Sequence, residues 1–301
     1  MANLIEYKKF SFINIDDHFF DSLKEDYPEF EEWFGRKSVQ GEEAIVQYDE
    51  EGHLQGFLYT KDESQEVDNN ITPVMKPKRR LKVGTFKIDA HNTRLGEKFI
   101  KKIMDRAIYE GFEEAYVTIF PKHNRLIDLL KRYGFKDYGT KHEELVLLKD
   151  FSVCMGNIVY DYPLIQPKHK RKFLLSIYPK FHTPLFSDSI LKNEVRNTED
   201  LVKDVSFSNS IHKVYVCFMP KTATLKKGDL IAIYRTNDGM GPARFRSVVT
   251  SICQVEEVRT KCDFLSIEEY LKYCKYYSIF KEYDLRKWYQ NDNLVVIKMT
   301  Y

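Results

Sequence analysis

Strand and helix patterns alternate over residues 81–150, and this order constrains the fold more than any other feature of the chain. A run rich in Val, Phe and Ile at 81–88 predicts a strand, and the amphipathic stretch that follows predicts a helix over 95–111. A strand at 114–120, a helix that Gly134 ends, and a closing strand complete the segment. The order predicts an α+β (α/β) first half with a mixed central sheet and flanking helices.

The residues before 81 extend this sheet. Residues 4–15 predict a strand because polar and apolar residues roughly alternate, and Asp16 or Asp17 is placed to cap a helix after it. Two β-rich runs at 44–48 and 54–60 flank an Asp-Glu-Glu-Gly turn, which indicates a hairpin. The predicted order of the first half is therefore β-α-β-β-β-α-β-α-β.

The pattern changes near residue 150. Four prolines and a basic run mark residues 151–185, which we interpret as a partly extended connector. Residues 186–301 contain four β-rich runs and one helical stretch, and a small β-barrel is the simplest way to close them. We therefore expect a first domain at 1–150, a connector at 151–185 and a second domain at 186–301.

Charge and composition exclude some classes of protein. The chain has 301 residues, of which 43% are hydrophobic and 31% charged, values that are typical of a globular protein and not of a disordered one. The formal net charge of +2 does not by itself indicate a nucleic-acid-binding protein. Two local basic runs, at 76–82 and 168–172, are either solvated surface or sites for a polyanion.

The cysteines and the apolar runs bear on the cell compartment. The five cysteines form no Cys-x-x-Cys motif and do not fall near histidines at metal-binding spacing, so we expect reduced thiols and no structural zinc. The N-terminus has no apolar signal-peptide core, and no run is long enough to span a bilayer. These features predict a cytoplasmic protein without a membrane partner.

The joint between the strand at 81–88 and the helix after it has two interpretations. A helix N-terminus presents unpaired N–H groups and the positive end of a dipole, so it binds phosphate readily. Gly96 would let the backbone approach an anion, and Arg94 would supply charge-assisted hydrogen bonds. One glycine and one arginine before a helix are a weak signal when taken alone, and an ordinary loop entering an amphipathic helix is the alternative.

The segment around this joint resembles the GNAT family of acetyl-CoA-dependent N-acyltransferases. The resemblance covers residues 1–150, is strongest over 81–140, and includes the Tyr-Gly-Phe corner at 133–135. The resemblance implies acetyl-CoA as cofactor, with a turn and helix that hold its pyrophosphate. It also implies that the preceding strand separates from its neighbour and pairs with the pantetheine arm. An Asn at the start of the next helix is implied to contact the cofactor. The residues so implied are Thr93, Arg94, Leu95, Gly96 and Glu97 for the turn, Phe86, Lys87 and Ile88 for the strand, and Asn124 for the next helix.

The sequence departs from the family pattern at the phosphate loop and at the general acid. Asn92 and Arg94 stand where the family has glycines, and Leu130 stands where many members have the Tyr that protonates the departing thiolate. The protein therefore either works without a dedicated acid or binds CoA without turnover. No catalytic residue is assigned. The side chains that could act as a general base are Glu42, Glu43, Asp89 and His91, and the alternative for each is a surface or loop residue.

The second half resembles the ASCH/PUA-like β-barrel group, whose members bind RNA or modified nucleobases. The stretches "KKGDLIAIYR" and "VVTSICQVEEV" carry the resemblance. Aromatic rings that stack on a base, Ser and Asn that read its edge, and Arg that holds phosphate are the chemistry of a nucleotide pocket. The predicted nucleic-acid-binding residues are Ser208, Asn209, Lys213, Tyr234, Arg235, Arg244 and Arg246; the alternative is a core Tyr234 with exposed, ion-paired arginines.

The two resemblances together imply an acetyltransferase that moves an acetyl group from acetyl-CoA to an amine. RNA, tRNA or a nucleotide that the barrel recruits is one expected carrier of that amine. Such a combination fits a bacterial or phage protein. Two other readings stay open: a non-catalytic CoA- and RNA-binding regulatory protein, and an acetyltransferase for a small amine or protein Lys with a structural barrel. The chain is expected to be a monomer or a homodimer.

Overall fold

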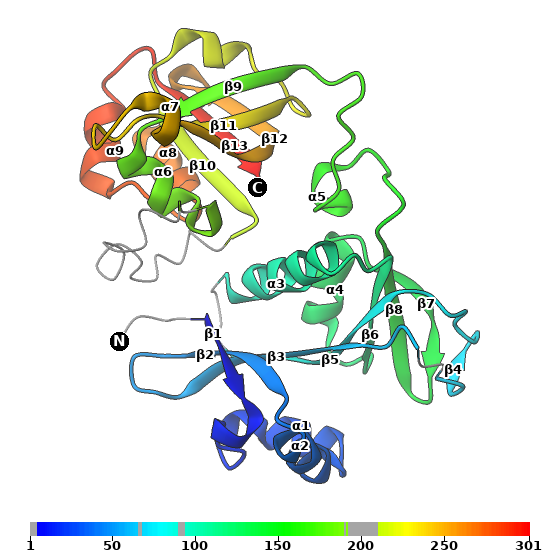
Figure 1. Cartoon of the computed structure of the whole chain (residues 1–301). Helices are drawn as coiled ribbons and strands as arrows, with labels where there is room; N and C mark the ends of the chain where they lie inside the picture. Colours follow the sequence, from blue (N-terminus) through cyan, green and yellow to red (C-terminus); the bar gives the residue numbers. More distant parts are fainter. Residues whose placement is uncertain (1–4, 66–67, 90–93, 190, 192–209) are drawn as a thin grey trace. The chain divides into compact units, whose positions relative to one another are not determined.

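The computed structural model describes residues 5–65, 68–89, 94–189, 191 and 210–301. The chain divides into two compact units, Met1–Val153 and Cys154–Tyr301, which are coloured from blue to green and from green to red in Figure 1. Each unit is built on a β-sheet of its own. The predicted fold class is confirmed: a mixed sheet with flanking helices is followed by a second sheet.

The first unit has an eight-stranded sheet. Its spatial order is β1-β2-β3-β5-β6-β8-β7-β4. Among the described residues β5 and β6 form the parallel pair, and the other neighbours are antiparallel. The strands are β1 (Ile5–Lys9), β2 (Glu43–Tyr48), β3 (Leu54–Asp62), β4 (Ile71–Thr72), β5 (Arg80–Ile88), β6 (Glu114–Ile119), β7 (Lys136–Lys141) and β8 (Glu144–Asp150).

Helices cover both faces of this sheet. Helices α1 and α2 lie on one face and α3 and α4 on the other (Figure 1). Strand β3 shows why the faces differ, because Phe57 packs with the aromatic core under α2 while its neighbour Gly56 faces α3. A Cβ at Gly56 would lie 2.8 Å from the Phe99 ring, so the missing side chain lets α3 approach the sheet. The helices are α1 (Asp21–Asp26), α2 (Phe30–Val39), α3 (Leu95–Tyr109) and α4 (Asn124–Arg132), with 3₁₀ turns η1 (Phe10–Phe12) and η2 (His18–Phe20).

Most predicted elements of the first unit are confirmed within a few residues. The hairpin, β5, α3, β6, α4 and β8 lie where the sequence patterns placed them. Asp17 caps η2 by accepting a hydrogen bond from the Phe19 N–H at 2.9 Å, and Gly134 ends α4 with a φ of 86°. The first strand ends at Lys9, and α2, β4 and β7 were not predicted.

The basic run at 76–82 leads into β5, which begins at Arg80, and three of its side chains are ion-paired, so the run is not one continuous cationic surface. Arg80 is 4% exposed, and its Nε donates to Glu114 Oε1 at 2.6 Å. Lys78 bonds the second oxygen of Glu114 at 3.2 Å, and Lys82 bonds Glu63 at 3.2 Å. Ion pairs across neighbouring strands therefore account for three charges of the run.

The second unit has a five-stranded sheet of order β10-β13-β12-β11-β9. Strand β9 is parallel to β11, and the other neighbours are antiparallel. The strands are β9 (Lys172–Ile177), β10 (His212–Cys217), β11 (Leu230–Arg235), β12 (Val248–Thr260) and β13 (Val295–Thr300). The helices are α5 (Ile158–Asp161), α6 (Pro179–Leu185), α7 (Ala243–Arg246), α8 (Ile267–Cys274) and α9 (Glu282–Trp288), with 3₁₀ turns η3 (Ser187–Ser189), η5 (Pro220–Thr224) and η6 (Lys261–Asp263).

The segment expected as a connector, 151–185, contributes to the second sheet. Strand β9 lies within it, and its side chains Leu175 and Ile177 are buried in the core of the second unit. Pro167 precedes β9, and Pro179 is the first residue of α6, so the prolines mark the ends of β9 and not one continuous extended connector. Among the described residues no pairing joins β9 to β10, so closure into a barrel stays a prediction.

Candidate active site

Strands β5 and β6 are paired for only half of their length. The parallel register begins at Arg80 with Glu114 and ends at Val83 with Val117. Beyond that point β3 still pairs with β5 up to Ile88, and β8 still pairs with β6 up to Ile119. The two strands therefore separate, and the β6-facing edge of residues 84–88 offers backbone N–H and C=O groups to a ligand.

The side chains of this free strand segment anchor it from both faces. Phe86 is 9% exposed and packs against Phe99 of α3, with ring centroids 5.8 Å apart. The Lys87 ammonium donates to Ser22 Oγ at 2.7 Å and to the carbonyl oxygen of Phe19. Because Phe86 and Lys87 are held in this way, the segment is fixed while its outer backbone edge stays available.

Helix α3 begins directly beyond the separated strands. Arg94 is its N-cap residue, and Thr93, which the family resemblance also implies, lies outside the described residues. Glu97 in the first turn is buried, and its Oε1 lies 3.3 Å from Arg94 Nη1 and 3.8 Å from Arg132 Nη1. Two guanidinium groups and the positive end of the helix dipole therefore meet at one carboxylate.

Gly96 has a packing role that the sequence did not indicate. A Cβ at Gly96 would lie 2.6 Å from Leu129 Cδ2, so the glycine allows α4 to approach α3. Leu95 beside it is 1% exposed and contacts the Gly56 position on β3. Asn124 is the first residue of α4 and is exposed, as its predicted place at a helix start requires.

Helix α1 connects the two separated strands. Lys87 ties β5 to the start of α1, and Asp26 at the end of α1 contacts the residues that follow β6. The Asp26 side chain is 7% exposed, and its Oδ2 lies 3.1 Å from His123 Nε2 while its Oδ1 accepts from Lys122. This arrangement makes His123 an aspartate-oriented imidazole that is 41% exposed.

A second polar pair stands at the same end of β6. The Tyr27 hydroxyl donates to Glu144 Oε1 at 2.6 Å, and the Tyr27 ring packs on Phe120 with centroids 5.2 Å apart. Burial, and then the hydrogen bond to Glu144, raise the pKa of Tyr27 far above its usual range. Tyr27 therefore keeps its proton and holds the Glu144 carboxylate in place.

Neither aromatic residue near the missing general acid replaces it. Leu130 is fully buried in α4, and Tyr133 next to the corner is fully buried as well. The Tyr138 hydroxyl donates to the Val74 carbonyl at 3.3 Å. The Asp26–His123 and Tyr27–Glu144 pairs supply polar groups next to the end of β6, and the sequence patterns did not indicate these four residues.

The predicted nucleic-acid residues of the second unit fall into two groups. Lys213 and Arg235 are buried; the Lys213 ammonium lies over the Tyr301 ring, and Arg235 Nη1 donates to the Arg246 carbonyl at 3.1 Å. Tyr234 is half-buried and Arg244 is exposed. Ser208 and Asn209 lie outside the described residues.

Arg246 has a fixed partner. Its guanidinium binds both carboxylate oxygens of Asp238, and this hydrogen bonding holds the pKa of Asp238 well below its usual range. An arginine in a bidentate pair of this kind is less available to a phosphate than one without a partner. Arg244 and Tyr234 are therefore the predicted residues that remain at the surface without such a pair in the described part of the chain.

Comparisons with known proteins give partial likenesses. No protein-family model matches the chain, and no curated protein matches it. Among solved structures, the PaiA N-acetyltransferase of Thermoplasma acidophilum in complex with coenzyme A is 14% identical, with 49% of this chain and 99% of that chain covered and a TM-score of 0.33. A GNAT-family acetyltransferase of Listeria monocytogenes is 13% identical, with 48% and 94% covered and a TM-score of 0.33.

Two further observations concern the described residues only. None of their helices combines the length and the apolar character that crossing a bilayer needs. Nowhere among them do three or more His, Cys, Asp or Glu side chains gather in an arrangement that could hold a metal ion.

Proposed function

We propose that the first unit is an acetyl-CoA-dependent N-acyltransferase. The observation that carries this proposal is the separation of β5 from β6 beyond Val83 and Val117, next to the N-terminus of α3. A free strand edge can pair with an extended, amide-containing arm, and a helix N-terminus suits the phosphates at the other end of the same ligand. These are the two features that the resemblance to the GNAT family implies for residues 86–97.

The side chains at the α3 N-terminus are compatible with an anionic ligand. Arg94 and Arg132 supply guanidinium groups that can form charge-assisted hydrogen bonds with phosphate. Glu97 now occupies both, so a bound pyrophosphate has to compete with that carboxylate. We therefore expect CoA to bind here with an affinity that Glu97 reduces.

The polar pairs at the end of β6 suit the acceptor amine. When bound, acetyl-CoA would supply an activated acyl group for the amine nitrogen, and its sulfur would end as the thiol with the proton that the amine loses. His123, oriented by Asp26, is placed to take the proton that the amine loses. Glu144 adds a carboxylate that can attract a protonated amine to this end of the sheet.

The identity of the acceptor is proposed only by class. Half-exposed Tyr234 and exposed Arg244 support the proposal that the second unit recruits RNA or a nucleotide. The buried Leu130 at the usual general-acid position supports the alternative of a CoA-binding protein without turnover. RNA recruitment is supported if the protein is retained on RNA in a way that falls steeply with salt, and if it transfers the acetyl group to an RNA-linked amine. Transfer to a small amine or to Lys without RNA supports a second unit that is only structural.

Binding of acetyl-CoA, measured by isothermal titration calorimetry at fixed ionic strength, tests the cofactor site. We expect Arg94→Glu to weaken binding by about 10-fold or more, because it replaces a phosphate ligand by a repelling charge. We expect Glu97→Gln to tighten binding by about 3- to 10-fold, since it releases two guanidinium groups. If the two substitutions change the affinity for acetyl-CoA in opposite directions, the ligand places a negative charge at this turn.

A matched control comes from the second unit, where Arg286 makes an analogous pair with Glu282 along α9. Arg286→Glu should leave acetyl-CoA binding unchanged. The proposal fails if the wild-type protein shows no binding at millimolar acetyl-CoA, or if Arg94→Glu binds as tightly as Arg286→Glu.

A further inference from the structure

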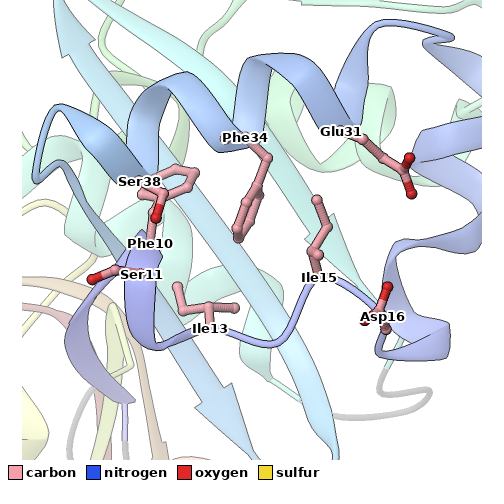
Figure 2. A pocket seen from close by; sticks show the side chains of 9 residues that line it. Phe10, Ser11, Ile13, Ile15, Asp16, Glu31, Phe34 and Ser38 are labelled. Atoms are coloured by element: carbon pink, nitrogen blue, oxygen red, sulfur yellow. The ribbon is translucent and has the colours of Figure 1, made fainter.

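A cavity of about 400 Å³ lies between α2 and the segment that precedes α1. Phe10, Ile13, Ile15 and Phe34 form its apolar wall (Figure 2). Phe10, Ile13 and Phe34 are almost fully buried, so the wall is part of the aromatic core and not a loose surface. A volume of this size is in the range of small-molecule sites.

The polar groups of the cavity are at its two ends. Asp16 and Glu31 stand at one end, while Ser11 and Ser38 stand at the other (Figure 2). Both carboxylates are exposed at the rim, and Lys24 pairs with Glu31 at 2.7 Å. One ammonium thus faces two carboxylates, which leaves the acidic end with an excess of negative charge.

The surrounding chain strengthens this charge. Residues 16–32 contain eight Asp or Glu and one Lys. Residues outside the segment pair with two of these carboxylates, Lys122 with Asp26 and Arg36 with Glu32, so the excess of negative charge lies mainly around the remaining carboxylates. Such an excess attracts cations and repels anions. A fatty acid or another carboxylate would therefore meet repulsion at the end of the cavity where its charged group must lie.

Gly35 lines the cavity from the middle of α2 and is itself exposed. Glycine in a helix interior costs about 1 kcal/mol relative to alanine. The residue has no positive φ and a Cβ there would meet nothing within 4 Å, so neither backbone geometry nor packing requires glycine. A long side chain at this position, such as leucine, therefore has open space to occupy beside the cavity wall.

We propose that this cavity binds a small amphiphilic amine, with its apolar body on the Phe10–Phe34 wall and its ammonium group between Asp16 and Glu31. The ammonium competes with Lys24 for Glu31 and pairs with Asp16. A hydroxyl or amide at the far end of the ligand can reach Ser11 or Ser38. The site lies on α2, and its binding is independent of acetyl-CoA and of acyl transfer.

Three matched probes test the charge requirement with the full-length protein: 4-phenylbutylamine, 4-phenylbutanol and 4-phenylbutyrate. Calorimetry should show the amine binding about 10-fold more tightly than the alcohol, and the carboxylate not binding measurably. Trp33 packs on Phe10 at 5.6 Å, so its fluorescence reports on this wall in a Trp288→Phe background that removes the other tryptophan. The amine should change Trp33 emission along the same binding curve.

Two kinds of variant locate the site. Gly35→Leu should abolish amine binding while keeping or raising the melting temperature, because it fills the cavity and improves helix propensity. Asp16→Asn with Glu31→Gln should reduce amine affinity to that of the alcohol, whereas Glu32→Gln, which changes the neighbouring carboxylate paired with Arg36, should not. Equal binding of the three probes, no binding of the amine, or full binding by Gly35→Leu would each overturn the proposal.

Discussion

Replacing Glu114 by alanine is expected to lower the free energy of unfolding of the first unit by about 3–5 kcal/mol. The Glu114 side chain is 5% exposed and accepts hydrogen bonds from Arg80 on one oxygen and from Lys78 on the other. Arg80 is just as buried, so its guanidinium would lose its counter-charge in a site that water hardly reaches. Lys78 is 35% exposed and can turn to solvent, which confines the cost mainly to Arg80.

Urea denaturation followed by circular dichroism measures this effect, with Glu113→Ala as the matched control. Glu113 is the neighbouring residue of the same type and is exposed, so its replacement should cost about 0.5 kcal/mol or less. The double variant Arg80→Met with Glu114→Leu should be more stable than Glu114→Ala alone, since it removes both buried charges. Equal stability of the Glu113 and Glu114 variants would show that the pair is effectively solvated.

This ion pair also bears on the site. Arg80 and Glu114 are register partners at the start of the parallel pair, four residues before the strands separate. The paired half of β5 and β6 is thus fixed by a buried charge pair, and the separated half is held from outside by β3, β8 and α1.

Elements with their own local pattern were predictable from the sequence. The apolar stripe of α3, the continuous β-rich run of β6 and the glycine that ends α4 each carry a signal within about 15 residues. Strand β7 carries none: its sequence, Lys-Asp-Tyr-Gly-Thr-Lys, is polar, and it is a strand because β8 and β4 pair with it. Its Gly139 leaves no room for a side chain beside the Thr72 carbonyl, a requirement that only the paired structure reveals.

The candidate site was predictable only where it is local. The turn at Arg94 follows from a strand, a loop and a helix that are contiguous in sequence. The Asp26–His123 and Tyr27–Glu144 pairs join residues 97 and 117 positions apart, and no motif spacing reveals such a pair. The available signal was the polar run Pro-Lys-His-Asn directly after the β6 pattern, since side chains at the end of a strand gather at one edge of a sheet.

The charged runs show a second limit of local reasoning. The sequence gives the positions of the lysines and arginines at 76–82 but not of their partners, which are 19 and 34 residues away for Lys82 and Arg80. The two interpretations of this run, solvated surface and polyanion site, both omit the internal ion pairs, which appear only when β3, β5 and β6 are aligned. Gly96 is similar, because its packing partner Leu129 lies on the next helix.

His123→Gln is expected to lower kcat/KM for the acceptor amine by about 100-fold while leaving the Kd of acetyl-CoA unchanged. The reason is geometric: Asp26 is 7% exposed and bonds His123 Nε2, which orients the ring and leaves its other nitrogen for the amine. Release of the CoA thiol across a panel of primary amines (a diamine, an amino sugar and a peptide N-terminus) measures the rate. Asp26→Asn should lower it less, by about 10-fold, because Asp26 acts through His123.

Matched variants separate this base from the Glu144 carboxylate. His53→Gln, at an exposed histidine in the β2–β3 turn, should keep the full rate. Glu144→Gln should keep more of the rate than His123→Gln, because His123 is the group that takes the proton of the amine. If Glu144→Gln abolishes turnover while His123→Gln retains the full rate, Glu144 is the base and the assignment to His123 is wrong.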